Sequence, residues 1–241
     1  MIIYGKNAVI ESLRANKAIF KLYILDRYAT EVGEVEVLAK RANIKIEYLP
    51  KEKLTKLCGD EHHQGYLAEC ADFTYCEVDD ILQYADSLGQ QPFVVILDGV
   101  VDPHNLGSVV RVCECAGVHG IILPKHNACP INSTVVKTSA GALSNMKIAK
   151  VANLVYAIEK LQKAGVWVYA VELGGQNIYQ TNLKGALGLV IGSEGEGVGQ
   201  LIKKRCDGVV TMPMFGNINS LNASVAAGVA VFEAVRQRGG Y

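Results

Sequence analysis

Short, almost wholly apolar runs recur through the second part of the chain and constrain its fold more than any other feature. A strand that is apolar at every position is buried on both faces, whereas a half-buried strand alternates apolar and polar residues. Stretches long enough for a loop and a helix separate the runs, so the pattern predicts an α/β fold with a parallel sheet that helices cover on both faces. The runs are FVVIL from Phe93, GIIL from Gly120, VWVYAV from Val166, LGLVI from Leu187 and GVVTM from Gly208.

The chain before these runs predicts a separate, small α/β domain. Helical periodicity covers residues 7–15, 34–42 and 51–57, and strand patterns cover 21–25, 44–49 and 66–71. We therefore predict a first domain at 1–73 and a second at 93–241, for which 241 residues suffice. Residues 74–92 are predicted as a linker that contains one amphipathic helix, 78–88, followed by a Gly, Gln and Pro segment.

Charge and composition exclude several classes of protein. The 24 basic and 24 acidic side chains cancel, so net charge gives no hint of nucleic acid, although a local basic patch stays possible. The apolar runs are far shorter than the roughly 20 residues that span a bilayer. The amino terminus lacks the basic-then-apolar order of a secretory signal, so we expect a cytoplasmic protein without membrane contact.

The seven cysteines contain no CxxC pair. A zinc site could be formed by Cys58, His62, His63 and Cys70, but their spacing fits no common structural pattern. We expect no metal.

Ligands bind outside the carboxyl ends of strands in such a sheet, and three loops fall there. The first, residues 98–108, leads into a helix that carries Arg111. From spacing alone, Asn105 could be an ordinary helix cap and Arg111 a surface charge.

The second and third loops carry glycine and polar residues. Residues 192–199 contain glycines that let the backbone approach a ligand closely, but they match neither GxGxxG nor GxxxxGK[ST]. Glu194 and Glu196 would also repel a phosphate, which argues against a dinucleotide or P-loop enzyme. In the third loop Ser220 and Asn222 precede a helix of small residues, where both could simply be caps.

Together the three loops resemble a known family. The segments DGVVDPHNLGSVVRVCECAGV, LVIGSEGEGV and MPMFGNINSLNASVAAGVAVFEAV resemble, in order, the three motifs of the SpoU (TrmH-like) RNA ribose 2′-O-methyltransferases. KTSAGALSN, residues 137–145, resembles the family's sequence between the first two motifs, and the likeness covers 93–238. YGKNAVIESL and HHQGYLAEC are similar to the ribosomal-protein-like RNA-binding domain that precedes it in many members.

The resemblance implies a fold, a reaction and partners. It implies a deep trefoil knot in the second domain, a homodimer formed through it, and S-adenosylmethionine as methyl donor. The two-domain layout points to a guanosine in the peptidyl-transferase loop of 23S rRNA. Other open possibilities are a tRNA or another rRNA site, a nucleotide-dependent α/β enzyme of another class, and a non-catalytic RNA-binding ribosome-assembly protein.

The resemblance also implies roles for particular residues. A guanidinium is almost never neutral in a protein, so we expect Arg111 to grip a phosphate and stabilise an alkoxide rather than act as a base. Glu194 is expected to orient Arg111, and Asn105 to order its loop. Donor binding through the backbone is expected at Gly192, Met212 and Leu221, and the transfer site is expected at Asn105, Arg111, Glu194, Ser220 and Asn222.

Overall fold

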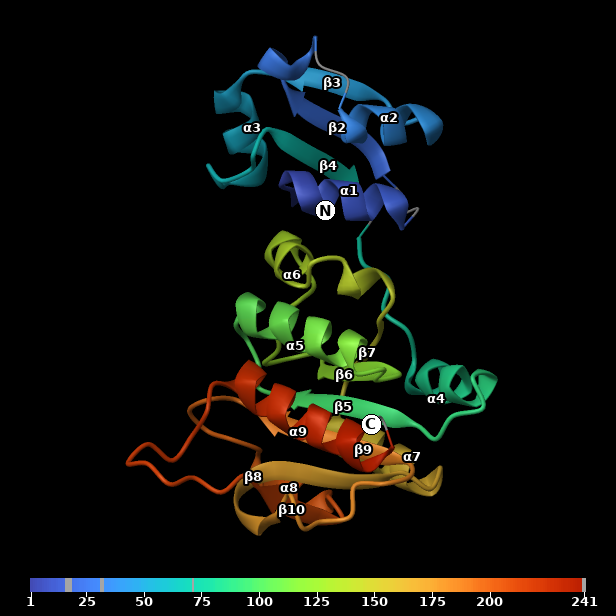
Figure 1. Cartoon of the computed structure of the whole chain (residues 1–241), viewed down its shortest axis with the longest axis vertical. Helices are drawn as coiled ribbons and strands as arrows, with labels where there is room; N and C mark the ends of the chain where they lie inside the picture. Colours follow the sequence, from blue (N-terminus) through green and yellow to red (C-terminus); the bar gives the residue numbers. More distant parts are fainter. Residues whose placement is uncertain (16–18, 31–32, 71, 240–241) are drawn as a thin grey trace. The chain divides into compact units, whose positions relative to one another are not determined.

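The computed structural model describes residues 1–15, 19–30, 33–70 and 72–239, which form two compact units (Figure 1). The first unit comprises Met1–Thr74 and Ile131–Ser144. The second comprises Tyr75–Pro130 and Asn145–Tyr241. The chain therefore passes between the units at 74/75, 130/131 and 144/145.

The first unit contains a four-stranded mixed sheet with the order β1-β4-β2-β3. Antiparallel pairing joins β4 to β1 and β2, and β3 lies parallel to β2. The small α/β arrangement is confirmed, although β1 was not predicted and residue 71, the end of the predicted strand 66–71, lies outside the described residues. The elements are β1 (Ile2–Tyr4), α1 (Lys6–Arg14), β2 (Ile19–Leu25), η1 (Asp26–Tyr28), α2 (Glu34–Arg41), β3 (Ile46–Leu49), α3 (Lys51–Cys58) and β4 (Tyr66–Cys70).

A segment from the second half of the sequence completes the first unit. It holds α6 (Ser133–Thr138) and η2 (Ala142–Ser144), and α6 contacts α1 and β1. Val135 and Val136 are buried there, and the Lys137 ammonium lies 5.0 Å from the centroid of the Tyr4 ring. The segment falls inside the range predicted for the second domain, 93–241, yet it packs within the first unit.

The second unit is built on a six-stranded sheet with the order β10-β8-β9-β5-β6-β7, in which every neighbouring pair is parallel. The prediction of a parallel sheet is confirmed. The predicted knot stays a prediction. The strands are β5 (Phe93–Asp98), β6 (Gly120–Pro124), β7 (Lys147–Val151), β8 (Trp167–Asn177), β9 (Leu187–Gly192) and β10 (Gly208–Thr211).

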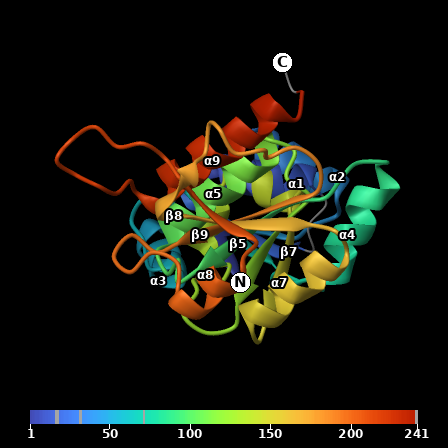
Figure 2. The same ribbon diagram turned by 90° about the horizontal axis from the view of Figure 1, so that it is seen from below.

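Helices cover both faces of this sheet, as continuous apolar strands require. On one face α5 (Pro103–Cys115) packs against α9 (Ala223–Gln237), and on the other α7 (Leu154–Lys163) packs against α8 (Gln200–Arg205) (Figure 2). The face with α7 also holds α4 (Val78–Ser87), whose Ile81 leaves no room for a Cβ at Gly120, because the two would lie 2.6 Å apart. The range predicted as a linker, 74–92, thus contributes a helix to the core of this unit.

No helix in the described ranges combines the length and apolar composition that a membrane crossing requires.

Candidate active site

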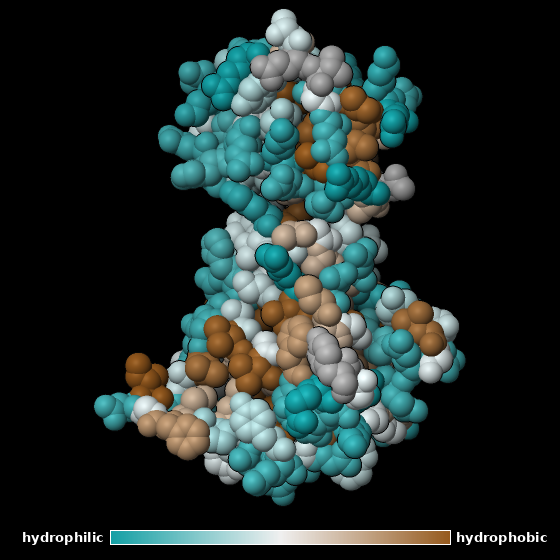
Figure 3. Space-filling view, in the orientation of Figure 1, coloured by the Kyte–Doolittle hydropathy of each residue, from teal (hydrophilic) through white to brown (hydrophobic). Residues whose placement is uncertain are grey.

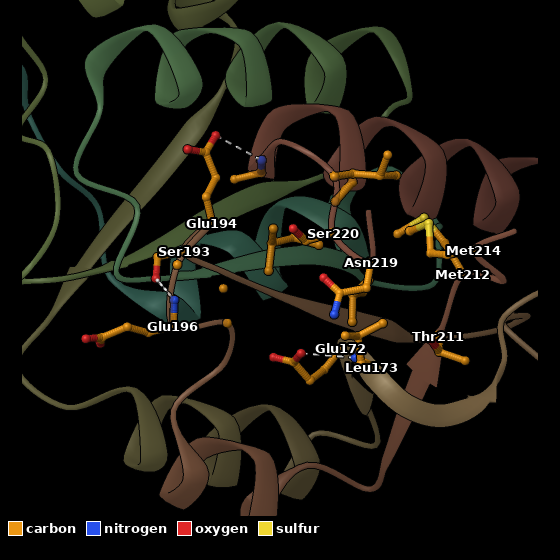
Figure 4. Close-up of a pocket in the computed structure, with 18 residues that line it drawn as sticks. Glu172, Leu173, Ser193, Glu194, Glu196, Thr211, Met212, Met214, Asn219 and Ser220 are labelled. Atoms are coloured by element: carbon orange, nitrogen blue, oxygen red, sulfur yellow. Dashed lines mark hydrogen bonds between the residues drawn. The ribbon is translucent and has the colours of Figure 1, made fainter. Parts of the chain in front are cut away.

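A cavity of about 310 Å³ opens at the carboxyl ends of β9 and β10, beside the middle of β8 (Figure 4). The loop that follows β9 forms one wall, and the loop between β10 and α9 forms another. The second and third loops therefore meet, as the position of ligand sites in parallel sheets predicts. Five of the predicted site residues line this cavity: Gly192, Glu194, Met212, Ser220 and Leu221.

The cavity combines apolar walls with carboxylates. Met212 and Ile191 are buried in its walls, and Glu172, Glu194 and Glu196 line it (Figure 4). None of these three carboxylates forms an ion pair with a residue that the structure describes. Negative charge of this kind disfavours a phosphate and favours a positively charged ligand that also presents apolar surface.

Gly192 is required by the loop's own backbone. A Cβ at this position would overlap the backbone of Gly197 and Val198. The turn that brings them there is closed by the Gly197 N–H, which donates to the Ser193 carbonyl (2.9 Å), and by the Glu196 N–H, which donates to Ser193 Oγ (3.3 Å). Glycine at 192 thus permits a close approach between two parts of the protein.

Glu172 is a cavity residue that sequence reasoning missed. Its Oε2 accepts from the Val198 N–H (2.8 Å) and its Oε1 from the Leu173 N–H (3.0 Å). A Cβ at Gly197, where φ is +66°, would overlap the Glu172 carboxylate. Glu172 therefore positions the loop that follows β9, and the available signal was an acidic residue directly after the apolar run 166–171.

Glu194 joins all three loops. Its Oε1 accepts from Asn105 Nδ2 (3.0 Å), from Asn222 Nδ2 and from the Ala223 N–H (3.4 Å). Asn222 Nδ2 also donates to Asn105 Oδ1 (2.9 Å). The Glu194 carboxylate thus forms one polar cluster with the amides of Asn105 and Asn222 at the starts of α5 and α9. The two asparagines lie 89 and 28 residues from Glu194 in the sequence.

Helix capping explains how the two asparagines reach Glu194. Asp102 caps α5, since its Oδ1 accepts from the Asn105 N–H (2.9 Å). The interpretation of Asn105 as the cap is therefore wrong, and its side chain is free to donate to Glu194. Asn222 does cap α9, because its Oδ1 accepts from the N–H groups of Ser224 (3.0 Å) and Val225 (3.3 Å), while its amide nitrogen points to the cluster.

Arg111 does not take part in the hydrogen bonds of this cluster. It is exposed on α5, and its side chain makes no hydrogen bond or ion pair with any described residue. The contact expected between Glu194 and Arg111 is not formed, and Glu194 holds Asn105 and Asn222 instead. The Arg111 guanidinium is thus free to bind an external anion.

Across the ranges that the structure describes, no three or more His, Cys, Asp or Glu side chains are arranged to hold a metal ion.

Comparison with known proteins defines the class. Residues 2–76 match the family model for RNA 2′-O ribose methyltransferase substrate binding, and residues 92–232 match the model of the SpoU rRNA Methylase family. With the parallel sheet and its cavity, these matches define an RNA ribose methyltransferase preceded by a substrate-binding domain. The chain belongs to the SpoU rRNA methylase family.

Relatives and solved structures agree with this assignment. The chain is 40% identical over 239 residues to the putative TrmH family tRNA/rRNA methyltransferase YacO of Bacillus subtilis, covering 98% of this chain and 95% of the relative. It is 38% identical over 241 residues to the 23S rRNA (guanosine-2′-O-)-methyltransferase RlmB of Xanthomonas campestris, covering 98% and 96%.

Two structures that hold S-adenosylmethionine share the fold. The rRNA methyltransferase from Sinorhizobium meliloti has a TM-score of 0.79 at 25% identity, covering 98% of this chain and 86% of that one. The SpoU methyltransferase AviRb from Streptomyces viridochromogenes has a TM-score of 0.80 at 22% identity, covering 98% and 89%. The prediction of an S-adenosylmethionine-dependent RNA 2′-O-methyltransferase is confirmed at the level of the family.

Proposed function

We propose that this protein transfers the methyl group of S-adenosylmethionine to the ribose 2′-hydroxyl of a guanosine in the peptidyl-transferase loop of 23S rRNA. The observation that carries the proposal is the cavity at the ends of β9 and β10, which shares Glu194 with the Asn105 and Asn222 cluster. The similarity to a 23S rRNA guanosine methyltransferase supports the choice of RNA.

The cavity fits the donor. When bound, S-adenosylmethionine supplies a methyl group on a positively charged sulfur. The carboxylates of Glu172, Glu194 and Glu196 stabilise positive charge in the cavity. Apolar wall atoms match an adenine ring, and backbone groups of Gly192, Met212 and Leu221 would hold the donor.

The polar cluster fits the acceptor. Asn105 and Asn222 fix Glu194 through Oε1 alone, and Oε2 has no partner among the described residues. That oxygen is free to accept a hydrogen bond from a ribose hydroxyl and so to orient it. Arg111, which is always charged, binds the neighbouring phosphate and stabilises the negative charge that develops on the 2′-oxygen, and Ser220 contributes a hydroxyl at the cavity wall.

The same proposal extends to assembly and location. Four apolar side chains, Phe215, Ile218, Val225 and Phe232, are 98%, 78%, 50% and 41% exposed, and brown surface gathers along the start of α9 and at the tip of the preceding loop (Figure 3). Exposed apolar surface of this kind is typical of an interface, and we assign it to a second copy of the chain. Residues 1–73 bind the RNA, residues 93–241 bind the donor, and the protein acts in the cytoplasm.

Methylation assays test the substrate. The protein is incubated with tritiated S-adenosylmethionine and either a 23S rRNA fragment that contains the peptidyl-transferase loop or total tRNA. We expect label in the rRNA fragment at one guanosine, which then resists alkaline cleavage. The Asn105→Ala variant should lose at least about tenfold in rate. The matched control is Gln83→Ala, an exposed amide on α4 without a partner among the described residues.

A tRNA substrate is the second candidate, because the Bacillus subtilis relative is named for both RNAs. Label confined to tRNA would replace the rRNA assignment. No label in any RNA, with the donor bound, would refute catalysis.

A further inference from the structure

A second cavity lies at the same carboxyl edge of the large sheet, and no role has yet been assigned to it. Its volume is about 400 Å³, within the roughly 300–1,000 Å³ of small-ligand sites. It opens where β5, β6 and β7 end and where α7 and α8 begin. The Gly199 N–H donates to Asp98 Oδ2 (2.8 Å), and both residues line this cavity.

The loop that follows β9 separates the two cavities. Glu194, near its start, lines the first cavity, and Gly199, at its end, lines the second. A ligand that extends along the carboxyl edge of the sheet can therefore reach both. RNA is such a ligand, whereas the methyl donor is small enough for one cavity.

Polar groups in the second cavity are unused. His126, Asn127 and Gln200 are exposed, and their side chains make no hydrogen bond or ion pair with the part of the chain that the structure describes. Asn153 uses its side-chain oxygen to accept from the Val155 N–H (2.8 Å), which leaves its NH₂ group free to donate. Both hydrogen-bond donors and hydrogen-bond acceptors are thus available, as recognition of the edge of a nucleobase requires.

The remaining wall is apolar, and positive charge lies next to it. Leu201 is 64% exposed and Leu154 is buried beneath the opening. Lys125, beside His126 at the end of β6, is exposed and unpaired among the described residues. Apolar surface for a ring face, amides for its edge and a cation for a phosphate are the groups that recognise an unstacked RNA base.

We propose that this cavity binds the base of an RNA nucleotide that flanks the methylated one. The inference rests on the proposed function, since it takes the first cavity as the transfer site. It assigns His126 and Gln200 to base recognition and Lys125 to the adjoining phosphate. Contacts to a flanking base would contribute to the choice of target sequence as well as to affinity.

The test uses the full chain with His126→Ala, Gln200→Ala and the double variant. Gln83→Ala is the matched control. RNA affinity is measured by fluorescence anisotropy on the 23S rRNA fragment that contains the peptidyl-transferase loop, and donor-site integrity by titration with S-adenosylhomocysteine. We expect the RNA Kd to rise about fivefold in each single variant and at least about tenfold in the double variant. The Kd for S-adenosylhomocysteine should stay within about twofold, because these side chains do not line the first cavity.

A crosslink locates the contact directly. RNA with 4-thiouridine placed beside the target should crosslink to peptides that contain residues 124–127 or 199–202. An RNA Kd within twofold of wild type in the double variant, an equal loss in Gln83→Ala, or crosslinks confined to other peptides would each overturn the inference. If the wild type binds RNA without methylating it, the proposed function fails, while the Kd values and crosslinks still decide whether the cavity binds RNA.

Discussion

Asn222 performs two tasks with different atoms, so two substitutions separate stability from catalysis. Oδ1 caps α9 through the Ser224 and Val225 N–H groups, and Nδ2 donates to Glu194 and Asn105. Asn222→Ala removes both. Loss of the cap costs about 1 kcal/mol, and loss of the bond to the exposed Glu194 costs about 0.5 kcal/mol. At roughly 2–4 °C per kcal/mol for a chain of this size, the melting temperature should fall by about 3–6 °C.

Asn222→Asp keeps the acceptor oxygen and removes the donor. A carboxylate at the start of α9 is favourable for the helix dipole, which offsets part of its repulsion by Glu194. The melting temperature should therefore stay closer to wild type than in Asn222→Ala. Methyl transfer should fall at least about tenfold in both variants, which corresponds to about 1.4 kcal/mol in the transition state, because Glu194 loses one of the two amides that position it.

Calorimetry and single-turnover methylation with saturating donor measure the two effects. Asn217→Ala, an exposed asparagine of the same loop without a partner among the described residues, should melt as the wild type does. An Asn222→Ala protein with an unchanged melting temperature would refute the cap. An Asn222→Asp protein with full activity would show that the contact with Glu194 is dispensable.

Three further perturbations test other parts of the second unit. Gly192→Ala should lower the melting temperature by several degrees, because overpacking costs roughly 1–3 kcal/mol, and it should weaken S-adenosylhomocysteine binding. Gly195→Ala is the control, because its Cβ meets open space, and it should melt as the wild type does. Equal melting temperatures of the two variants would contradict the packing argument. Arg111→Lys should lose activity by orders of magnitude with donor binding intact, and recovery of its single-turnover rate toward pH 10 would instead indicate a general base. Burial lowers the pKa of His119, whose Nδ1 accepts from the Phe93 N–H (2.9 Å). As the pH falls, His119 is therefore protonated in the unfolded chain before it is protonated in the folded one. The free energy of unfolding should thus decrease as the pH drops below about 6.5. His119→Asn should show a shallower fall between pH 7 and 5 by thermal melting, and an unchanged slope would assign the titration to another group.

The large sheet was predictable because burial on both faces leaves a strong sequence signal. Phe93–Leu97 and Leu187–Ile191 are buried throughout, so no polar residue interrupts either run. β7 was missed because Lys147 and Lys150 interrupt its apolar residues, and their ammonium groups lie 5.3 Å and 5.0 Å from tyrosine rings. In the sequence, a lysine whose side chain covers an aromatic ring cannot be distinguished from an ordinary exposed charge.

The candidate site was predictable in its loops and less so in its contacts. Parallel topology brings the ends of strands to one edge, which is why the loops that carry Asn105, Glu194 and Asn222 meet. The hydrogen-bond partners of these side chains depend on which residue caps each helix, and on small differences in the distance between donor and acceptor. Asp102 rather than Asn105 caps α5, and Glu172 on β8 supports the loop that follows β9. The spacing of residues in the sequence determines neither contact.

The packing of residues 131–144 limits how the two units can be separated. Residues 131–144 lie within the range proposed to bind the donor, 93–241, but pack in the first unit, where Val135, Val136 and Leu143 are buried. Removal of residues 1–73 would therefore expose these apolar side chains on the fragment that remains, at about 1.5–3 kcal/mol for each fully exposed residue. A failure of that fragment to fold or to bind the donor would reflect the lost partner of α6, since the cavity at the ends of β9 and β10 contains no residue of the first unit. The roles of the two units are better separated by surface substitutions in the full chain, which leave α6 packed on β1.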